Sequence, residues 1–429
     1  MNKWSRYNYM FHKDGTYLLY NSISNSFVEM SKETYAELEK IKSGEIESVG
    51  DELKEELYKM KAIGSDDDFE IAKIHYVNLC RRFSQQSMAL TINPTLGCNF
   101  RCPYCFEGEH NTAPRMTDEV ENAIVDFIKR HQFVKKIGVT WFGGEPLMEF
   151  ERMRTLTYKM LDLGIAYSAS IITNGYLLNE ERIKSLYDLK IQYVQITLDG
   201  MREIHDKRRC LKNGNPTFDH IMDNVKMLAK MTPKIHVGIR VNLDDSNTGD
   251  FINLYNYIDG MNLKNVAIHP AFVKDYTGNC SNLCALDGDR QYAFIKDQYI
   301  RKGLTFSRFY PSGYRTECSI RNMNTVTIGP LGELYKCWND VGNPEKVYGS
   351  VFSGTSNEKV LMEYLMGADP FEDLKCRKCI LLPVCSGGCP YDRLEAQKNG
   401  NLETCPLMKN RMEDHLWIHY LSKKQQVKA

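Results

Sequence analysis

Ten of the 14 cysteines fall into two groups whose spacing constrains the fold more than any other feature of this chain. The first group has the form Cys98-x3-Cys102-x2-Cys105. The second group comprises Cys318-x13-Gly332-x4-Cys337, then Cys376-x2-Cys379-x5-Cys385-x3-Cys389, and finally Cys405. Thiolates at such short spacings can converge on one metal centre. Because the cysteines form two such groups, we expect several centres.

Disulfides are the alternative use of these cysteines, and the expected compartment argues against them. The chain begins Met-Asn-Lys-Trp-Ser-Arg-Tyr, without the apolar segment of a signal peptide. No apolar run approaches the roughly 20 residues that span a bilayer. We therefore expect a cytoplasmic protein with no membrane partner, and in a reducing cytosol closely spaced thiols favour metal ligation or catalysis.

Charge and length limit the partners and the number of domains. The chain has 429 residues, enough for two or three domains. Lys+Arg and Asp+Glu both total 55, so the net charge is zero. This balance argues against a polyanionic partner attracted by the overall charge, although a local basic groove is compatible with it. We therefore expect that the protein does not bind nucleic acid.

Residues 1–85 show the pattern of a small α+β element. Apolar residues favour strands near 7–11, 17–20 and 27–30, with a tight turn at Asp14-Gly15. Ser31 is a suitable N-cap for a helix that ends at Gly44, and a second helix ends near Gly64. Three strands followed by helices predict a winged-helix-like element, with a purely structural cap as the alternative.

Residues 86–305 alternate apolar strands with amphipathic helices. The expected strands are 88–92, 137–142, 169–173, 193–198, 236–241 and 266–268, and the expected helices include 118–130 and 149–163. This alternation predicts a parallel sheet with covered faces. Six such units predict an α/β fold of the partial (β/α)6 TIM type, with its chemistry at the carboxyl ends of the strands. The first cysteine group directly follows the first strand.

Residues 306–429 form the third expected domain. This region holds the second cysteine group, many turns and little long periodicity. We expect its metals to hold it together more than an apolar core does.

The first cysteine group suits a cubane cluster with one open iron. A [4Fe–4S] cluster takes four ligands, whereas this group supplies three. A structural zinc site fits less well because it usually closes with four ligands, and no fourth is nearby.

The same cysteines carry a family resemblance. Cys-x3-Cys-x2-Cys with an aromatic residue before the last cysteine, here Tyr104, resembles the motif of radical S-adenosylmethionine (SAM) enzymes. A Gly-Gly-Glu-Pro motif ends the second expected strand, as in that family. The resemblance implies that this motif binds the methionine ammonium of SAM, with the carboxylate as its partner. The implied cofactor contacts are Tyr104, Gly143, Gly144, Glu145, Pro146, Thr173, Asn174, Thr197, Asp199, Arg240 and Arg209, whose equivalent contacts the cofactor carboxylate.

The second cysteine group resembles the SPASM domain, which usually carries two auxiliary [4Fe–4S] clusters. With the radical-site cluster this implies three clusters in total. The implied ligands of the outer auxiliary cluster are Cys376, Cys379, Cys385 and Cys405, and those of the inner one are Cys318, Cys337 and Cys389. A zinc ribbon is the alternative for Cys376-x2-Cys379 taken alone.

The inner auxiliary cluster is one ligand short. Some relatives have a further cysteine where this chain has Ser312. Cys280 or Cys284 could supply the eighth ligand, or an open iron could bind a substrate thiolate. Alternatively these two are buried small side chains, which is what we expect for Cys80 and Cys210.

The resemblance implies SAM cleavage to a 5′-deoxyadenosyl radical, fed by a flavodoxin- or ferredoxin-type electron donor. SPASM relatives mostly modify peptides or proteins. We expect a maturase of a ribosomally made (RiPP) precursor that captures its leader sequence and forms a thioether crosslink. The alternative is an anaerobic sulfatase maturase, which forms formylglycine. Those enzymes carry an Asp that acts as a base directly after the cysteine equivalent to Cys337, where this chain has Trp338. They also begin near the radical motif, whereas this chain has almost ninety residues before it.

A non-catalytic iron–sulfur electron carrier would explain the cysteines but not the Gly-Gly-Glu-Pro motif or Arg209. The sequence identifies no catalytic acid or base directly. Asp275, Tyr276 and Asp340 are candidates by position only.

Overall fold

The computed structural model describes residues 3–64, 66–105, 113–274, 285–304, 317–399 and 404–428. The chain packs into two compact units. The first unit comprises Met1–Phe83, Asp297–Asn322 and Glu363–Ala429, and the second comprises Ser84–Lys296 and Met323–Met362. The two ends of the chain therefore share one unit. The three domains expected at 1–85, 86–305 and 306–429 remain a prediction.

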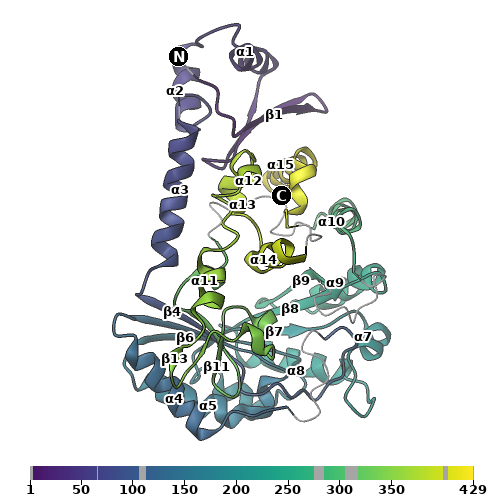
Figure 1. The fold of residues 1–429 in the computed structure, drawn as a ribbon. Helices are drawn as coiled ribbons and strands as arrows, with labels where there is room; N and C mark the ends of the chain where they lie inside the picture. Colours follow the sequence, from purple (N-terminus) through teal and green to yellow (C-terminus); the bar gives the residue numbers. More distant parts are fainter. Residues whose placement is uncertain are drawn as a thin grey trace. The chain divides into compact units, whose positions relative to one another are not determined.

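The second unit is built on a parallel sheet (Figure 1). Its six successive parallel strands are β4 (Ser87–Ile92), β5 (Lys136–Trp141), β6 (Ala166–Thr173), β7 (Ile191–Thr197), β8 (His236–Leu243) and β9 (Val266–Phe272). The helical segments after these strands are α4 (Asp118–Arg130), η1 (Pro146–Glu149), α5 (Phe150–Leu161), α6 (Glu180–Ser185), α7 (Arg202–Arg208), α8 (Phe218–Met231), η2 (Thr248–Asp250), α9 (Phe251–Asp259) and α10 (Gly288–Lys302). This arrangement confirms the predicted α/β fold with a parallel sheet.

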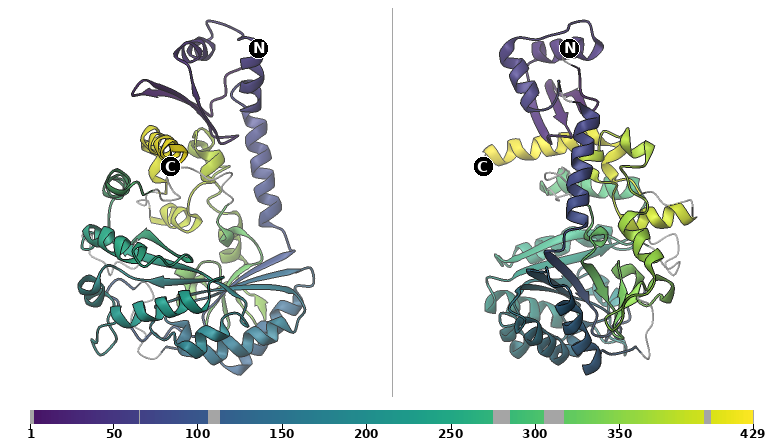
Figure 2. Two further views of the ribbon diagram at one scale, coloured as in Figure 1. Left: turned by 180° about the vertical axis from the view of Figure 1, so that it is seen from behind. Right: turned by 60° about the vertical axis from the view of Figure 1, so that its left-hand side comes forward.

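Strand periodicity explains why helices cover one face of this sheet. In β5, Ile137, Val139 and Trp141 are fully buried, whereas the alternate residues Gly138 and Thr140 are partly exposed. Successive side chains of a strand point to opposite faces, so the apolar set faces the helices. Helices α4, α5 and α8 lie along that face (Figures 1 and 2).

The sheet does not close into a barrel within the described residues. Its order is β13-β12-β11-β10-β4-β5-β6-β7-β8-β9, which leaves β9 and β13 at opposite ends. Beside β4 lies a later segment, which the sequence pattern did not predict as strands. Its elements are β10 (Thr325–Ile328), parallel to β4, and the antiparallel strands β11 (Glu333–Tyr335), β12 (Gly349–Ser350) and β13 (Gly354–Thr355). Cys337 directly follows β11, so the sheet itself positions this cysteine.

The N-terminal element of the first unit follows the prediction closely. Strands β1 (Asn8–Lys13), β2 (Thr16–Asn21) and β3 (Ser26–Met30) form an antiparallel sheet in that order. Helices α1 (Lys32–Ser43) and α2 (Asp51–Lys59) follow. The Ser31 side chain accepts a hydrogen bond from the Thr34 amide at the start of α1, and Gly44 ends this helix with φ of 82°. Such a left-handed conformation favours glycine.

The sequence pattern did not predict helix α3 (Asp67–Arg82). Apolar residues occur on more than one side of this helix: Ile71 is buried, whereas Phe69 is 64% and Tyr76 is 67% exposed. The resulting pattern has no single apolar stripe, so the periodicity that identifies helices is weak here.

Helical elements of varied length dominate the rest of the described chain. They are η3 (Ser319–Arg321), η4 (Trp338–Asp340), η5 (Pro344–Lys346), α11 (Glu358–Met366), α12 (Leu374–Arg377), α13 (Leu382–Cys385), α14 (Pro390–Asn399), η6 (Leu407–Asn410) and α15 (Met412–Lys428). Across the described residues, no helix combines the length and apolar character needed to cross a membrane.

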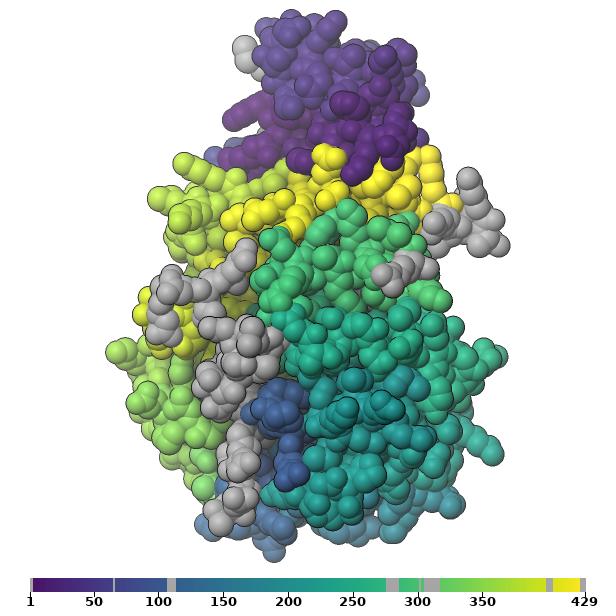
Figure 3. Space-filling view, turned by 90° about the vertical axis from the view of Figure 1, so that its right-hand side faces the viewer, coloured from purple at the N-terminus to yellow at the C-terminus, as the bar shows by residue number. Residues whose placement is uncertain are grey.

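Both faces of the N-terminal sheet are covered within the first unit. On one face, Leu19 packs with Leu38, Ile41 and Leu57 of α1 and α2. On the other face, residues of β1 and β2 pack against the C-terminal segment; this core consists of Phe11, Leu18, Tyr20, Leu381, Val384, Met408, Met412, Leu416 and Tyr420. The space-filling view shows C-terminal residues (yellow) directly against this element (Figure 3). β1 and β3 are the edge strands, and β3 exposes Val28 and Glu29.

A buried ion network joins α3 to the cysteine-rich segment of the same unit. The Arg82 guanidinium is fully buried and donates to Glu317 at 3.1 Å and to Asp369 at 2.9 Å. Replacing Arg82 by Met would remove the nearest cation from two buried carboxylates and leave Asp369 with the more distant His75 at 3.6 Å and Arg321 at 4.0 Å. We expect the free energy of unfolding of this unit to fall by about 3–5 kcal/mol, measured by urea denaturation.

The matched control is Arg81→Met, because Arg81 is exposed on the same helix. This substitution should change the stability by less than about 0.5 kcal/mol. Equal losses in the two variants would contradict a structural role for the buried network.

Candidate functional site

The loops after β4 and β5 approach each other as closely as two backbones can. A side-chain Cβ on Gly143 would lie 2.3 Å from the Thr95 carbonyl oxygen, and one on Gly144 would lie 2.4 Å from the carbonyl oxygens of Leu96 and Gly97. Gly143 also has a φ of 113°. Both positions therefore require glycine, and the contact places the Gly-Gly-Glu-Pro motif directly against the loop that carries Cys98.

The three thiols of this loop are neighbours and form no disulfide. Each thiol is partly exposed. Cys102 interacts electrostatically with both Cys98 and Cys105. Burial, reinforced by the charge of Glu145, raises the pKa of Cys98 to about 12. Burial likewise raises the pKa of Cys102 to about 11, although Arg209 opposes it. Such thiols become thiolates only when cations bind them, as the irons of a cluster would.

The residues around this loop fit a cluster and an anionic ligand better than a single metal ion. Among the described residues, no three His, Cys, Asp or Glu side chains gather closely enough to hold one ion. A cubane cluster instead spreads its ligands over separate irons. Two buried donors, Arg209 Nε and Asn99 Nδ2, have no hydrogen-bond partner among the described residues. Buried donors of this kind need an acceptor, and a cofactor carboxylate supplies one.

The Glu145 carboxylate is held inside the protein. Its Oε1 accepts hydrogen bonds from the Leu147 amide at 3.0 Å and the Thr173 hydroxyl at 2.7 Å, and its Oε2 accepts one from the Asn174 amide at 2.7 Å. Burial raises the pKa of Glu145 despite these donors. The carboxylate thus ties the β5 loop to the end of β6. Its pairing with a cofactor ammonium remains a prediction.

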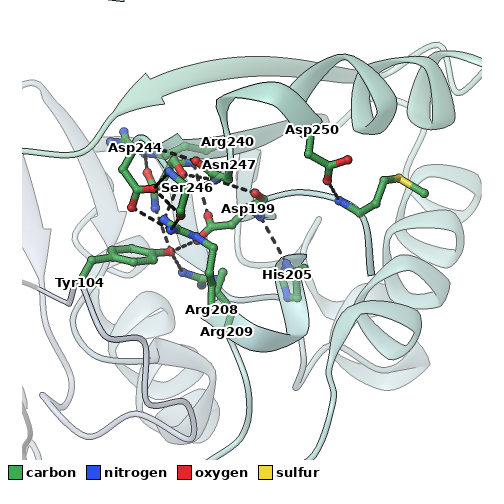
Figure 4. A network of polar contacts seen from close by, with 12 residues as sticks. Tyr104, Asp199, His205, Arg208, Arg209, Arg240, Asp244, Ser246, Asn247 and Asp250 are labelled. Atoms are coloured by element: carbon green, nitrogen blue, oxygen red, sulfur yellow. Dashed lines mark hydrogen bonds and ion pairs between the residues drawn. The ribbon is translucent and has the colours of Figure 1, made fainter. Parts of the chain in front are cut away.

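Tyr104 connects the cysteine loop to the ends of β7 and β8 (Figure 4). Its hydroxyl donates to Asp199 Oδ2 and accepts from Arg209 Nη1 at 2.8 Å. Arg208 lies over the Tyr104 ring at 4.8 Å and pairs with Asp199 at 3.1 Å. Burial raises the pKa of Tyr104 well above its ordinary value, so the phenol stays protonated and can donate.

A buried histidine fixes the backbone of Arg209. The Asp199 amide donates to His205 Nδ1 at 3.3 Å, His205 Nε2 lies 3.0 Å from the Thr217 hydroxyl, and this hydroxyl donates to the Arg209 carbonyl at 2.5 Å. Since the Thr217 proton is used, His205 Nε2 must carry the proton of a neutral imidazole. Burial lowers the pKa of His205 well below its ordinary value, in agreement with the neutral form.

The structure brings together most of the predicted cofactor residues and adds others. Thr197 and Arg240 are neighbours in register on β7 and β8, and Arg240 Nε donates to Asn242 at 2.8 Å. The sequence reasoning missed Arg208 and a polar group that joins the ends of β7 and β8: Asn242, Asp244 and Asn247. The sequence could have indicated these three residues, because they are polar and lie at or just after the end of an apolar strand.

The second cysteine group lies partly in each unit. Cys318, Cys376, Cys379, Cys385, Cys389 and Cys405 belong to the first unit, and Cys337 belongs to the second. Cys376 lies near Cys405, and Arg393 donates to the Cys376 sulfur at 3.4 Å. Lys409 donates to the Cys405 sulfur at 3.3 Å. These contacts fit the four predicted outer ligands, whereas convergence of the inner three remains a prediction.

The remaining predicted residues have varied outcomes. Asp340 is buried within the segment after Cys337. Asp275, Tyr276, Cys280 and Cys284 lie outside the described residues. The expectation that Cys80 is buried is wrong, because it is exposed on α3, and Cys210 is only partly buried. Cys80 lies on the outer side of a helix whose apolar residues occur on more than one side, and its hydrophobicity was a poor guide.

A family comparison identifies the parallel sheet and its cysteine loop. Residues 92–258 match the model of the radical SAM superfamily. The chain carries a radical SAM domain. The match covers the loop of Cys98, the Gly-Gly-Glu-Pro motif and Arg209, and it confirms the predicted resemblance for this part of the chain.

Curated relatives of this chain include two anaerobic sulfatase-maturating enzymes. The serine-type enzyme of Bacteroides thetaiotaomicron is 25% identical over 71% of this chain and 82% of that relative. The cysteine-type enzyme of Clostridium novyi is 24% identical over 77% of this chain and 96% of that relative.

Solved structures share the fold of the radical SAM domain and its surroundings. The structure of anSMEcpe with bound AdoMet has a TM-score of 0.60 at 19% identity and covers 79% of this chain and 96% of that one. Streptococcus suis SuiB bound to its precursor peptide SuiA has a TM-score of 0.55 at 15% identity and covers 95% of this chain and 99% of that one. The second match therefore includes more of the chain.

The close backbone approach of the two loops yields the first test of the site. In Gly144→Ala, the new methyl group must push the Cys98 loop away by clashing with two carbonyl oxygens. We expect the reconstituted protein to lose the iron and labile sulfide of one cluster, and 5′-deoxyadenosine formation to cease. Gly138→Ala in strand β5, which leads into this loop, is the control, because its added Cβ meets nothing within 4 Å. Full cluster content in Gly144→Ala would refute this role.

The unpartnered Arg209 donor yields a second test. Arg209→Ala should weaken SAM binding roughly 10- to 100-fold, the loss expected for a buried charged hydrogen bond. Equilibrium dialysis with the reconstituted protein measures this affinity. Arg202→Ala on the preceding helix is the control, since its side chain is 64% exposed and pairs with Asp219. An unchanged affinity in Arg209→Ala would leave the guanidinium a purely structural role.

Proposed function

We propose that this protein is a radical SAM maturase that modifies a ribosomally made precursor peptide. The observation that carries the proposal is the N-terminal sheet, whose faces are both covered while β1 and β3 remain edge strands. An extended peptide can add a strand to such an edge through main-chain hydrogen bonds, which demand little of its sequence. This mode of binding suits capture of a leader sequence.

The radical site would consist of the residues gathered at the carboxyl ends of the parallel strands. Cys98, Cys102 and Cys105 would hold a [4Fe–4S] cluster, and Arg209 with Asn99 would orient the carboxylate of SAM. When bound, the cluster and SAM supply a 5′-deoxyadenosyl radical. The other proposed cofactor contacts are Tyr104, Gly143, Gly144, Glu145, Pro146, Thr173, Asn174, Thr197, Asp199 and Arg240.

The second cysteine group would hold two auxiliary clusters with the ligand sets given above. We further propose a thioether crosslink as the product, a flavodoxin- or ferredoxin-type protein as electron donor, and the cytoplasm as the location. The donation from Arg393 and Lys409 to two of the outer sulfurs supports a metal centre there, because cluster thiolates accept such hydrogen bonds.

Sulfatase maturation is the second candidate, favoured by the curated relatives. Two observations place it behind peptide maturation. Trp338 stands directly after Cys337, where the sulfatase maturases carry an Asp that acts as a base. Trp338 is 46% exposed. The anSMEcpe match covers 79% of this chain and the SuiB match covers 95%.

An anaerobic assay separates these candidates. The reconstituted protein, SAM and dithionite should yield 5′-deoxyadenosine, and short peptides encoded near this gene should be converted to crosslinked products detected by mass spectrometry. A Cys- or Ser-containing sulfatase peptide should remain unmodified. Formylglycine in that peptide would establish the second candidate, and absence of 5′-deoxyadenosine would refute both.

Strand addition at β3 yields a test with single substitutions. In an edge strand, the N–H groups of alternate residues point away from the sheet, and the others bond to the neighbouring strand. Val28 and Glu29 are consecutive residues of β3. One of the substitutions Val28→Pro and Glu29→Pro therefore removes an outward-pointing donor, and the other removes a hydrogen bond to β2. The outward variant should keep its thermal stability and 5′-deoxyadenosine formation but lose affinity for the precursor at least about tenfold. Fluorescence anisotropy with the labelled peptide measures this. Full affinity in both folded variants would exclude the β3 edge.

A further inference from the structure

The segment that carries the outer cysteines has little regular structure of its own. Between Leu374 and Cys389 the only helices are α12 and α13, each of four residues. Helices this short are not stable alone, because the first turn costs more conformational entropy than its hydrogen bond returns. Something outside the backbone must therefore hold this segment in place.

Yet this segment supplies the apolar surface under the N-terminal sheet. Leu381 and Val384 pack against Phe11, Leu18 and Tyr20, with Cys379 and Cys385 at the edge of the same core. In a neighbouring core, Leu382 packs with Tyr7 and Ile23, and Cys376 lies against it. Three of the four outer cysteines thus border the apolar contacts that cover one face of the sheet.

Polar contacts reach the backbone beside the same cysteines. The Tyr7 hydroxyl donates to the carbonyl oxygen of Arg377 at 3.2 Å, one residue after Cys376. The Ser22 hydroxyl donates to the carbonyl oxygen of Ile380, one residue after Cys379. These contacts depend on the path of the cysteine segment, because they involve its main chain and not its side chains.

The fourth outer cysteine, Cys405, precedes the C-terminal elements that form the rest of the apolar surface under the sheet. Cys405 lies near Cys376, and its chain continues into η6 and α15. Met408, Met412 and Leu416 of these elements complete the core beneath the sheet. A metal centre shared by Cys376, Cys379, Cys385 and Cys405 would therefore link the two segments that together cover the sheet.

We propose that the outer metal centre has a structural function, namely to hold the apolar surface on which the N-terminal sheet packs. Metal binding to a segment without stable structure of its own is coupled to the folding of that segment. Loss of the centre should release Leu381, Leu382 and Val384 and so loosen the sheet. Its role for peptide capture rests on the proposed function, whereas its effect on the sheet does not.

Hydrogen–deuterium exchange of the full-length, anaerobically reconstituted protein tests this. In Cys379→Ala, the amides of β2 should exchange at least tenfold faster than in the wild type, while those of β6 in the second unit keep their rates. Cys98→Ala is the matched control, because it removes a ligand of the radical-site cluster and should leave β2 unchanged. Equal protection of β2 in wild type and Cys379→Ala would overturn the proposal.

A reciprocal measurement covers the case in which Cys379→Ala fails to fold. Leu18 and Leu19 are adjacent and fully buried but face opposite cores. Leu18→Ala weakens the surface shared with the cysteine segment and should speed iron release to a chelator severalfold more than Leu19→Ala does. Equal release from both variants would contradict the link.

The outcomes also separate this inference from peptide maturation. Faster exchange of β2 in Cys379→Ala, together with no peptide binding by the wild type, would keep the structural function and refute leader capture at the sheet. Unchanged exchange of β2 in Cys379→Ala, together with loss of peptide binding by this variant, would refute the structural function and keep peptide capture. The outer centre would then act at the peptide itself.

Discussion

The backbone contact between the loops after β4 and β5 is the constraint on which the radical site depends. Gly143 and Gly144 let this contact form, since any side chain there would meet the carbonyl oxygens of residues 95–97. From this contact the chain reaches Cys98 on one side and Glu145 on the other. Glu145 then joins the end of β6, and Tyr104 joins the ends of β7 and β8. The proposed cofactor residues are therefore one connected set, so a change at one loop should affect the others.

The two units use different physical means to hold their cysteines. In the second unit, Cys98 and Cys337 follow strands of one sheet, so backbone pairing positions them before any metal binds. In the first unit, Cys376 and Cys379 lie in a segment of four-residue helices. Its order must come from packing against the N-terminal sheet, from the buried Arg82 network and from the metal centre that we propose there. Stability and metal content should thus be coupled more strongly in the first unit.

The accuracy of the sequence predictions follows the strength of the local pattern. The parallel strands and α4 have clear periodicity, and Ser31 and Gly44 have the side chain and the conformation that their caps require. Helix α3 was missed because its apolar residues occur on more than one side. Strands β10 to β13 were missed because they are two to four residues long and are stabilised by pairing with β4, far away in the sequence. The family resemblance of the cysteine pattern implied ligand sets, but the apolar contacts of Leu381 and Val384 with Phe11 depend on tertiary packing alone.

The covered faces of the N-terminal sheet bear on what this element can bind. A winged-helix element that used its sheet face would need that face free, whereas here residues of β2 are buried on both sides. Recognition is then limited to an edge, which reads main-chain hydrogen bonds more than side chains. If the proposed leader capture takes place there, such an edge would tolerate varied leader sequences, and selectivity for the modified residues would come from the carboxyl ends of the parallel strands. Trp338 and Phe142, whose rings lie 5.8 Å apart in the second unit, are exposed enough to contribute to it.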